Sequence, residues 1–297
     1  MAQRGDFAQP AGAAQVSEAG ALITAVHTYP VKGCRGIAHQ AQTLTDTGLA
    51  WDRHWMFISD SGRFFTQREI PGLARVQVVL DARELILRSA GHPELRCPID
   101  DTGAQREVTV WRDRCQAEVN SVDTRAWLRA VTGTPGQLVR SMPGAERISA
   151  RQFTGEDVAP FRFADAFALL VIAEASLGEL NTRLARPVPM ARFRPNLVLR
   201  GLPPYAEDDI DRLRIGDIEL RCVKPCTRCI VTTTDQTTGE RDGVEPLRTL
   251  EGYRWIDSLR GAAFGVNAIV IRGAGQALRV GDQFDITWRD PRATRPW

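Results

Sequence analysis

The chain has 297 residues, 43% of them hydrophobic and 25% charged, which is typical of a globular protein of about two domains. Its 38 basic and 36 acidic residues leave a net charge of +2, so charge alone indicates neither a nucleic-acid nor a membrane partner. Lysine is almost absent, because the basic residues are 36 Arg and 2 Lys. Lys32 and Lys224 each lie two residues from a cysteine. Either a general bias toward arginine or a local need for lysine at these two positions explains this count.

Residues 1–20 are small and polar, without the apolar segment of a secretory signal, and they predict a disordered tail. No run approaches the roughly 18 apolar residues of a transmembrane helix. Six cysteines in a chain of this length are too few for a disulfide scaffold. These features favour a reducing cytoplasm as the location of the protein.

The first half of the chain is predicted to be rich in strands. Apolar segments between turn residues predict strands or hairpins at residues 21–29, 51–69, 76–91 and 106–119. The second of these turns at Asp60-Ser61-Gly62. Turn signals recur about every ten residues, as a barrel or sandwich requires. We therefore predict a strand-rich first domain over residues 21–140.

The second half mixes strands with short helices. Helices are predicted at residues 122–133, 174–184 and 245–254. Strands are predicted at residues 167–172, 193–201, 213–223, 229–235, 263–273 and 277–288. Residues 134–160 are rich in Gly, Pro, Ser and charge, which indicates a boundary and a second domain over 141–292. The predicted class is β-rich α+β.

The densest cluster of reactive side chains is Cys222-Val-Lys-Pro-Cys226-Thr-Arg-Cys229. Its C-x3-C-x2-C spacing also occurs in radical S-adenosylmethionine enzymes, but only 68 strand-rich residues follow Cys229, too few for their βα barrel. Zinc needs four ligands, and Cys34 is the only distant candidate. A plant-type iron–sulfur site needs C-x4-C-x2-C, which is absent. The remaining interpretation is a single thiolate that binds a metal carried by an organic cofactor.

The three thiols of this cluster differ in their local pattern. Cys222 alternates with apolar residues on one strand face, which predicts a core position. Pro225 is expected to end that strand. Cys229 directly follows Arg228, and a neighbouring cation lowers the pKa of a thiol, so Cys229 is the favoured thiolate. Packing remains an alternative for Cys226.

A second candidate segment is Tyr29-Pro-Val-Lys32-Gly33-Cys34-Arg35-Gly36, a basic turn that follows the first predicted strand. Such a turn can present backbone N–H groups and a cation to a phosphate. The segment matches neither a Walker A motif nor G-x-G-x-x-G, so nucleotide binding is not supported. Most basic loops are simply solvated, and this motif alone is weak.

Together with these segments, WDRHWMFISDSGRFFTQRE, EASLGELNTRL, FRPNLVL, YAED, IGDIEL and FGVN stand in order between about residue 20 and about residue 290. In this order the motifs resemble the MOSC family, and more closely its two-part members, the bacterial YcbX-type proteins and the mitochondrial amidoxime-reducing component. The resemblance implies an N-terminal β-barrel-like MOSC_N domain followed by a MOSC β-barrel. It also implies a molybdenum enzyme, in which a pyranopterin dithiolene holds the metal in a cleft between the domains and one cysteine thiolate completes the site.

The resemblance also assigns site residues. The metal-binding cysteine of the family is the second of the C-x-R-C pair, here Cys229. Asp165 aligns with an aspartate near the metal, which would hold a water molecule or relay protons. Contacts to the cofactor fall by motif on Lys32, Gly33, Arg53, Arg194, Asn196, Thr227 and Arg228. Structural alternatives stay open: Arg53 can pair with Asp52, and Asn196 and Asp165 can cap turns or helices.

The implied function is molybdenum-dependent reduction of N-hydroxylated small molecules such as amidoximes, from N–OH to N–H. The chain carries no ferredoxin cysteine set, haem motif or flavin fingerprint, so no iron–sulfur cluster, haem or flavin is expected in it. A separate ferredoxin or flavoprotein reductase is the expected electron donor. The alternative is a protein that binds the molybdenum cofactor or carries sulfur as a persulfide on Cys229.

Overall fold

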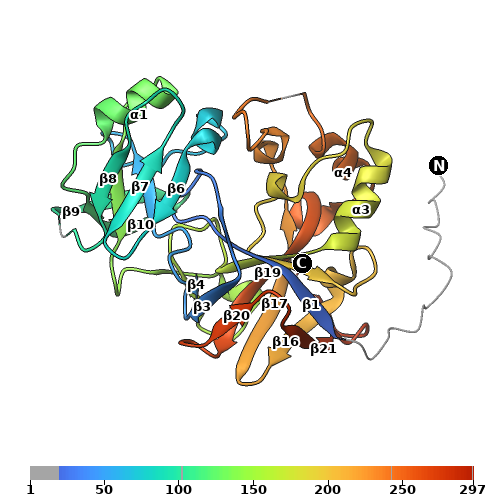
Figure 1. Ribbon diagram of the computed structural model, residues 1–297. Helices are drawn as coiled ribbons and strands as arrows, with labels where there is room; N and C mark the ends of the chain where they lie inside the picture. Colours follow the sequence, from blue (N-terminus) through green and yellow to red (C-terminus); the bar gives the residue numbers. More distant parts are fainter. Residues whose placement is uncertain (1–19, 102, 242, 296) are drawn as a thin grey trace.

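The computed structural model describes residues 20–101, 103–241, 243–295 and 297. Figure 1 shows two lobes, a barrel built mainly from the second half of the chain and an N-terminal lobe of smaller sheets. The arrangement confirms the predicted β-rich α+β class. Apart from Gly20, the tail predicted for residues 1–20 lies outside the described residues. Within the described ranges, no helix is both long and apolar enough to cross a membrane.

Seven strands close the barrel. In spatial order they are β14 (Leu169–Ala173), β15 (Leu197–Arg200), β1 (Ala21–Thr28), β21 (Gln283–Trp288), β16 (Ile210–Ile215), β17 (Ile218–Thr227) and β19 (Gly261–Arg272). β14 pairs back with β19, so the sheet has no open edge along this path. Only β14 and β15 run parallel, and α3 (Glu174–Arg183) lies in the connection that such a pair needs.

The barrel core consists of the inward side chains of these strands. Ile23, Leu213, Leu220 and Phe284 are fully buried there, as is Cys222. The core position predicted for Cys222 from strand alternation is therefore confirmed. β1 belongs to this barrel although it precedes the N-terminal lobe in the chain, and the division into domains 21–140 and 141–292 stays a prediction.

The N-terminal lobe encloses its own core between two sheets. One sheet contains β5 (Trp55–Ile58), β11 (Gln137–Ser141), β10 (Asp113–Val119) and β9 (Gln105–Val110), and the other contains β6 (Gln77–Leu80), β7 (Glu84–Arg88) and β8 (Leu95–Pro98). α1 (Arg125–Thr132) packs Leu128 and Val131 into the same core. The hairpins predicted in residues 76–91 and 106–119 and the helix predicted in 122–133 are confirmed.

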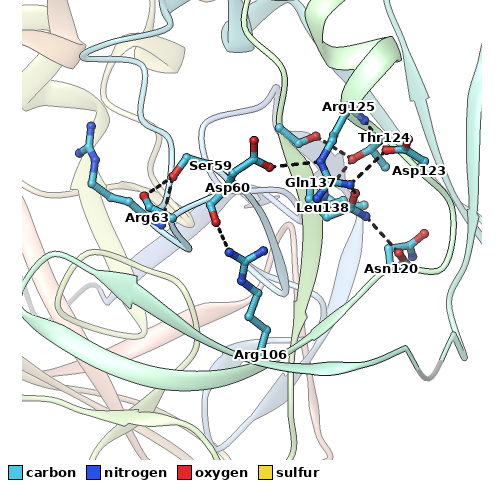
Figure 2. Close-up of polar contacts among 12 residues, drawn as sticks. Ser59, Asp60, Arg63, Arg106, Asn120, Asp123, Thr124, Arg125, Gln137 and Leu138 are labelled. Carbon is cyan, nitrogen blue, oxygen red and sulfur yellow. Dashed lines mark hydrogen bonds and ion pairs between the residues drawn. The ribbon is translucent and has the colours of Figure 1, made fainter.

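Polar contacts hold the edges of this lobe together (Figure 2). Thr124 Oγ1 accepts the backbone N–H of Leu138 at 2.9 Å, which ties the start of α1 to β11. Arg125 donates to the Gln137 side chain at 2.8 Å and to the Asp60 carboxylate at 3.3 Å. These contacts fix the turn after β5 relative to the helix.

The remaining elements are short. The strands are β2 (Ile37–His39), β3 (Ala41–Thr45), β4 (Gly48–Leu49), β12 (Arg147–Ile148), β13 (Pro160–Phe161), β18 (Trp255–Ile256) and β20 (Ala277–Arg279). The helices are α2 (Arg151–Thr154), α4 (Leu247–Tyr253) and the 3-10 turns η1 (Pro71–Arg75), η2 (Met190–Arg192), η3 (Ala206–Asp209), η4 (Ile230–Thr233) and η5 (Asp257–Leu259). β3 pairs with β20, so a segment near the start of the chain pairs with one near its end.

One predicted hairpin is shorter than expected, and two further local expectations are wrong. The hairpin predicted within 51–69 forms, since the Phe65 N–H donates to the Phe57 carbonyl and Ile58 bridges Phe64 antiparallel, but it ends where the Thr66 carbonyl accepts two backbone N–H groups. Within the strand predicted at 229–235, Ile230–Thr233 form η4 instead. The hydroxyls of Thr232 and Thr233 donate back to carbonyls three residues earlier, a pattern that competes with strand pairing. Pro225 does not end β17, since register shifts on either side of it absorb its missing N–H.

Candidate active site

One cavity of about 540 Å³ lies where the two lobes meet. Its lining includes every site residue that the sequence predicts: Lys32, Gly33, Arg53, Asp165, Arg194, Asn196, Thr227, Arg228 and Cys229. The volume falls within the range of small-molecule and cofactor sites. Both lysines of the chain line this cavity, since Lys224 is there as well. The structure therefore brings the predicted residues together, while their individual roles stay predictions.

Cys229 stands where β17 gives way to η4. Its backbone is extended, and its carbonyl accepts the backbone N–H and the hydroxyl of Thr232, both at 3.0 Å. The side chain is half-buried and lines the cavity, in contrast to Cys222 on the same segment. A thiol in this position is fixed by the backbone yet open to a ligand.

Arg228 lies against Cys226 rather than Cys229. Its Nη1 donates to Cys226 Sγ at 3.1 Å, and its Nη2 donates to the Phe193 carbonyl at 2.7 Å. Adjacency in the chain predicts that this cation lies beside Cys229. The structure instead gives its sulfur contact to Cys226, and Cys226 also lines the cavity.

Arg53 and Arg194 flank one aromatic ring. Their guanidinium carbons lie 4.4 and 4.2 Å from the ring centre of Tyr29, and both residues have left-handed backbones, with φ of 47° and 56°. Such backbones are uncommon for residues other than glycine and often accompany function. Burial lowers the pKa of Arg194 to about 10, so this guanidinium stays charged at neutral pH.

The site positions these arginines with few carboxylates. Arg53 pairs with Asp52 at 2.5 Å, as the structural alternative anticipated, yet it still lines the cavity. Asn196 is buried, and its Oδ1 accepts from Arg53 Nη1 at 3.1 Å and from a backbone N–H of β14. Its Nδ2 donates to the His27 carbonyl. Asn196 therefore holds Arg53 in place.

Hydrogen bonds between the side-chain amides of Gln67 and Gln236 connect the two lobes next to Arg194. Gln67 Nε2 donates to the Gly33 carbonyl at 2.6 Å, and Gln67 and Gln236 exchange hydrogen bonds at 3.1 and 2.9 Å. Gln236 Oε1 also accepts from Arg194 Nη1 at 3.1 Å. Gly33 itself has φ of 83°, a conformation that strains residues with a side chain.

Lys32 and Asp165 form an ion pair across the cavity wall. Lys32 Nζ donates to Asp165 Oδ1 at 2.5 Å and to the Phe163 carbonyl at 2.7 Å, and Trp111 Nε1 donates to the same carboxylate oxygen at 2.9 Å. Desolvation opposes ionisation of Asp165, but the charge of Lys32 and these two hydrogen bonds outweigh it and lower its pKa. Asp165 is therefore an anion at neutral pH.

The cavity as a whole is cationic. Six basic side chains line it, and Asp165 is the one acidic residue among its lining residues. Among the residues that the structure describes, Arg68, Arg194 and Arg228 pair with no carboxylate. Unpaired guanidinium groups beside a thiol suit a ligand that carries both an anion and a group that binds sulfur. Across the described ranges, no three His, Cys, Asp or Glu side chains gather as a metal site.

Several lining residues were not anticipated from the sequence. They are Thr66, Gln67, Arg68, Trp111, Thr232 and Asn267. Gln67 stands inside the segment FFTQRE, which belongs to a predicted hairpin and to a family motif but which suggested no site residue. Trp111 offers the clearest overlooked signal, because it occupies a two-residue hairpin turn where Gly, Asn or Asp is usual.

Comparison with known proteins covers both lobes. Residues 20–135 match the family model described as the MOSC N-terminal beta barrel domain, and residues 159–285 match the MOSC domain. The mitochondrial amidoxime-reducing component 1 of Mus musculus is 35% identical over 80% of this chain and 72% of that protein. Its Homo sapiens counterpart is 33% identical over 86% and 79%. The molybdenum cofactor sulfurase of Oryza sativa subsp. japonica is 32% identical over 78% of this chain but 31% of that protein.

Proposed function

Because this chain belongs to the MOSC family, with both of its domains matched, we propose that it is a molybdenum-cofactor-dependent reductase of N-hydroxylated compounds. The reaction converts an N–OH group to N–H, consumes two electrons and two protons, and releases water. The observation that carries the proposal is the convergence of a cationic wall and the Cys229 thiol on one cavity. Relatives named amidoxime-reducing component support this choice of reaction.

The residues present fit a pyranopterin cofactor. Its phosphate needs cations that are not already neutralised, and Arg194 and Arg228 meet this need within the described residues. The Arg228 Nε is buried and has no hydrogen-bond partner among the described residues, so it can donate a further hydrogen bond to a bound ligand. The Cys229 sulfur is a suitable soft ligand for the metal. When bound, the molybdenum cofactor supplies the two-electron redox chemistry.

The protein's own residues divide the remaining work. Lys32, Gly33, Arg53, Arg194, Thr227 and Arg228 hold the cofactor, and Asn196 positions Arg53. Asp165 is an anion, so it accepts hydrogen bonds from a substrate N–H or a water molecule rather than donating its own proton. Within the pair, the proton resides on Lys32 Nζ, which is the group able to pass one onward.

Electrons come from a separate ferredoxin or flavoprotein reductase. Reconstitution with candidate reductases tests this part, and turnover with NADPH alone would contradict it. The protein's six free cysteines suit a reducing compartment such as the cytoplasm.

The direct test is metal and pterin analysis of protein expressed in a host that makes the cofactor, followed by an assay with benzamidoxime and a chemical reductant. We expect about one molybdenum per chain and formation of benzamidine. Loaded protein that forms no benzamidine would overturn the proposed reaction.

A second candidate is a sulfur carrier, favoured by the similarity to a molybdenum cofactor sulfurase. Cys229 would then carry a persulfide. Mass spectrometry separates the two: labile sulfur on Cys229 without bound metal supports the carrier, whereas bound pterin and metal support the reductase.

A further inference from the structure

A second cavity of about 300 Å³ adjoins the first on the side of the N-terminal lobe. The two share Thr66, Arg68 and Trp111 in their linings. Phe64 and Thr109 contribute further walls, and an ion pair between Arg63 and Glu69 lies at its rim. This volume has room for a substituted aromatic ring, to which Phe64 and Trp111 offer aromatic walls among polar neighbours.

Trp111 stands at the boundary between the cavities in an unfavourable backbone conformation. It occupies the turn between β9 and β10 with φ of 58°, a conformation in which glycine is preferred. Trp111 is 38% exposed. The hairpin is tied to the segment that carries Asp165, because Arg147 binds Asp113 at 2.5 Å and the Ala164 carbonyl at 2.6 Å. The fold therefore holds the indole at a set position beside Asp165.

The surroundings of the indole suit a flat ligand. Phe64 meets it edge to face with centroids 4.9 Å apart, and the Arg68 guanidinium lies 4.5 Å above the ring. Arg68 is exposed, and among the described residues it pairs with no carboxylate, so a ligand can move it aside. Figure 2 shows the turn that precedes Phe64, where the Asp60 carbonyl accepts from Arg106 and the Asp60 carboxylate accepts from Arg125.

We propose that this second cavity is a subsite for the planar aromatic part of the substrate, which stacks on Trp111. The inference rests on the proposed function. With an aryl group against the indole, an amidoxime N–H reaches the Asp165 carboxylate that Trp111 Nε1 already contacts at 2.9 Å. Amidoximes whose amidoxime carbon carries an aromatic ring are thereby preferred over those that carry an aliphatic group.

Replacement of the indole tests the subsite. Trp111→Gly removes the ring and relieves the left-handed backbone, so the variant should fold. We expect the ratio of the KM for benzamidoxime to the KM for acetamidoxime to rise about tenfold, because loss of the indole N–H beside Asp165 affects both substrates alike and only benzamidoxime loses the stacking. Trp111→Phe keeps a ring but loses the N–H, and it should retain most of the aryl preference.

Trp51 provides a matched control. It is also 38% exposed and left-handed, with φ of 66°, but its ring stacks on Trp55 outside both cavities. Trp51→Gly should therefore leave the preference for aryl substrates unchanged.

Binding is measured separately on loaded, oxidised protein without reductant, using the dissociation constant of benzamidoxime. Binding that weakens about tenfold in Trp111→Gly supports the subsite even if the wild type forms no benzamidine, which would defeat only the proposed reaction. A different result would overturn the subsite but not the proposed reaction. In that result both wild type and Trp111→Gly turn over benzamidoxime, bind it equally well and have the same ratio of KM for benzamidoxime to KM for acetamidoxime.

Discussion

The barrel and the N-terminal lobe both line the cavity, but different interactions hold each of them together. The barrel closes seven strands around a single core, and its thiols emerge where β17 ends in η4. The lobe joins short sheets through polar contacts such as those of Thr124 and Arg125. Lys32, Arg53 and Arg68 reach the cavity from turns. The barrel half contributes Cys229, Arg194 and Arg228 to the lining of the cavity, whereas the N-terminal half contributes Lys32, Arg53 and Arg68. The site therefore needs both lobes.

The largest expected effect concerns the contribution of the barrel. Cys229→Ala should reduce turnover with benzamidoxime by at least about 100-fold, because the other thiol that lines the cavity, Cys226, already accepts a hydrogen bond from Arg228. The thermal midpoint should change little, since the side chain is half-buried and outside the core clusters. Cys115→Ala is a matched control, with a half-buried free thiol in the lobe away from the cavity. Equal activity of both variants would remove Cys229 from the mechanism.

The lobes also differ in how their buried groups titrate. Burial and then the charge of Asp208 raise the pKa of Glu207 in the barrel to about 7. The folded state therefore binds this proton more tightly, and the stabilisation is complete below about pH 4.5 and is lost as pH rises through 7. Burial, then Arg162 and Arg140, lower the pKa of His54 in the lobe to about 3. Its stabilisation is present above about pH 6.5 and is lost as pH falls toward 3.

Substitution of each group should expose these opposite slopes. Glu207→Gln should remove a decline of about 3 kcal/mol in unfolding free energy between pH 5 and pH 8. His54→Phe should remove part of the decline below pH 6.5. Chemical denaturation at several pH values measures both, and identical pH dependence in the two variants would contradict the assignment.

Removal of an unpaired guanidinium should weaken retention of the cofactor. We expect Arg194→Gln to lose pterin about 10- to 100-fold more readily, because Arg194 contributes a charge-assisted contact that no carboxylate already occupies. Pterin content after dialysis is the measurement. Arg200→Gln is the control, since Arg200 pairs with Glu174 on the surface. Similar losses from both variants would show a general effect of charge rather than a site.

The smallest expected effect compares the two lysines. Lys32→Arg should lower pterin retention a few-fold, since a planar guanidinium cannot replace an ammonium that is buried between the Phe163 carbonyl and Asp165. Lys224→Arg should be tolerated, because the Lys224 ammonium lies over the Phe153 ring and arginine stacks there equally well. Unchanged pterin retention in Lys32→Arg would show that the site has no need of a lysine at this position.

Local patterns in the sequence predicted much of the fold. Alternation placed Cys222 in the core, turn residues marked the hairpins of the lobe, and apolar spacing marked α1 and α3. These features depend on residues close together in the chain, which is why the sequence alone predicts them. The motifs in order indicated the family and nine site residues, and the structure brings those nine to one cavity.

The partners within that cavity depended on the tertiary structure. Lys32 meets Asp165 across 133 positions, Asn196 holds Arg53 across 143, and Arg228 turns to Cys226 although Cys229 is its neighbour. The strand expected at 229–235 became η4 because threonine hydroxyls found backbone carbonyls. Sequence order carries no distance between such residues. Only the closed barrel and the docked lobe decide which charge meets which partner.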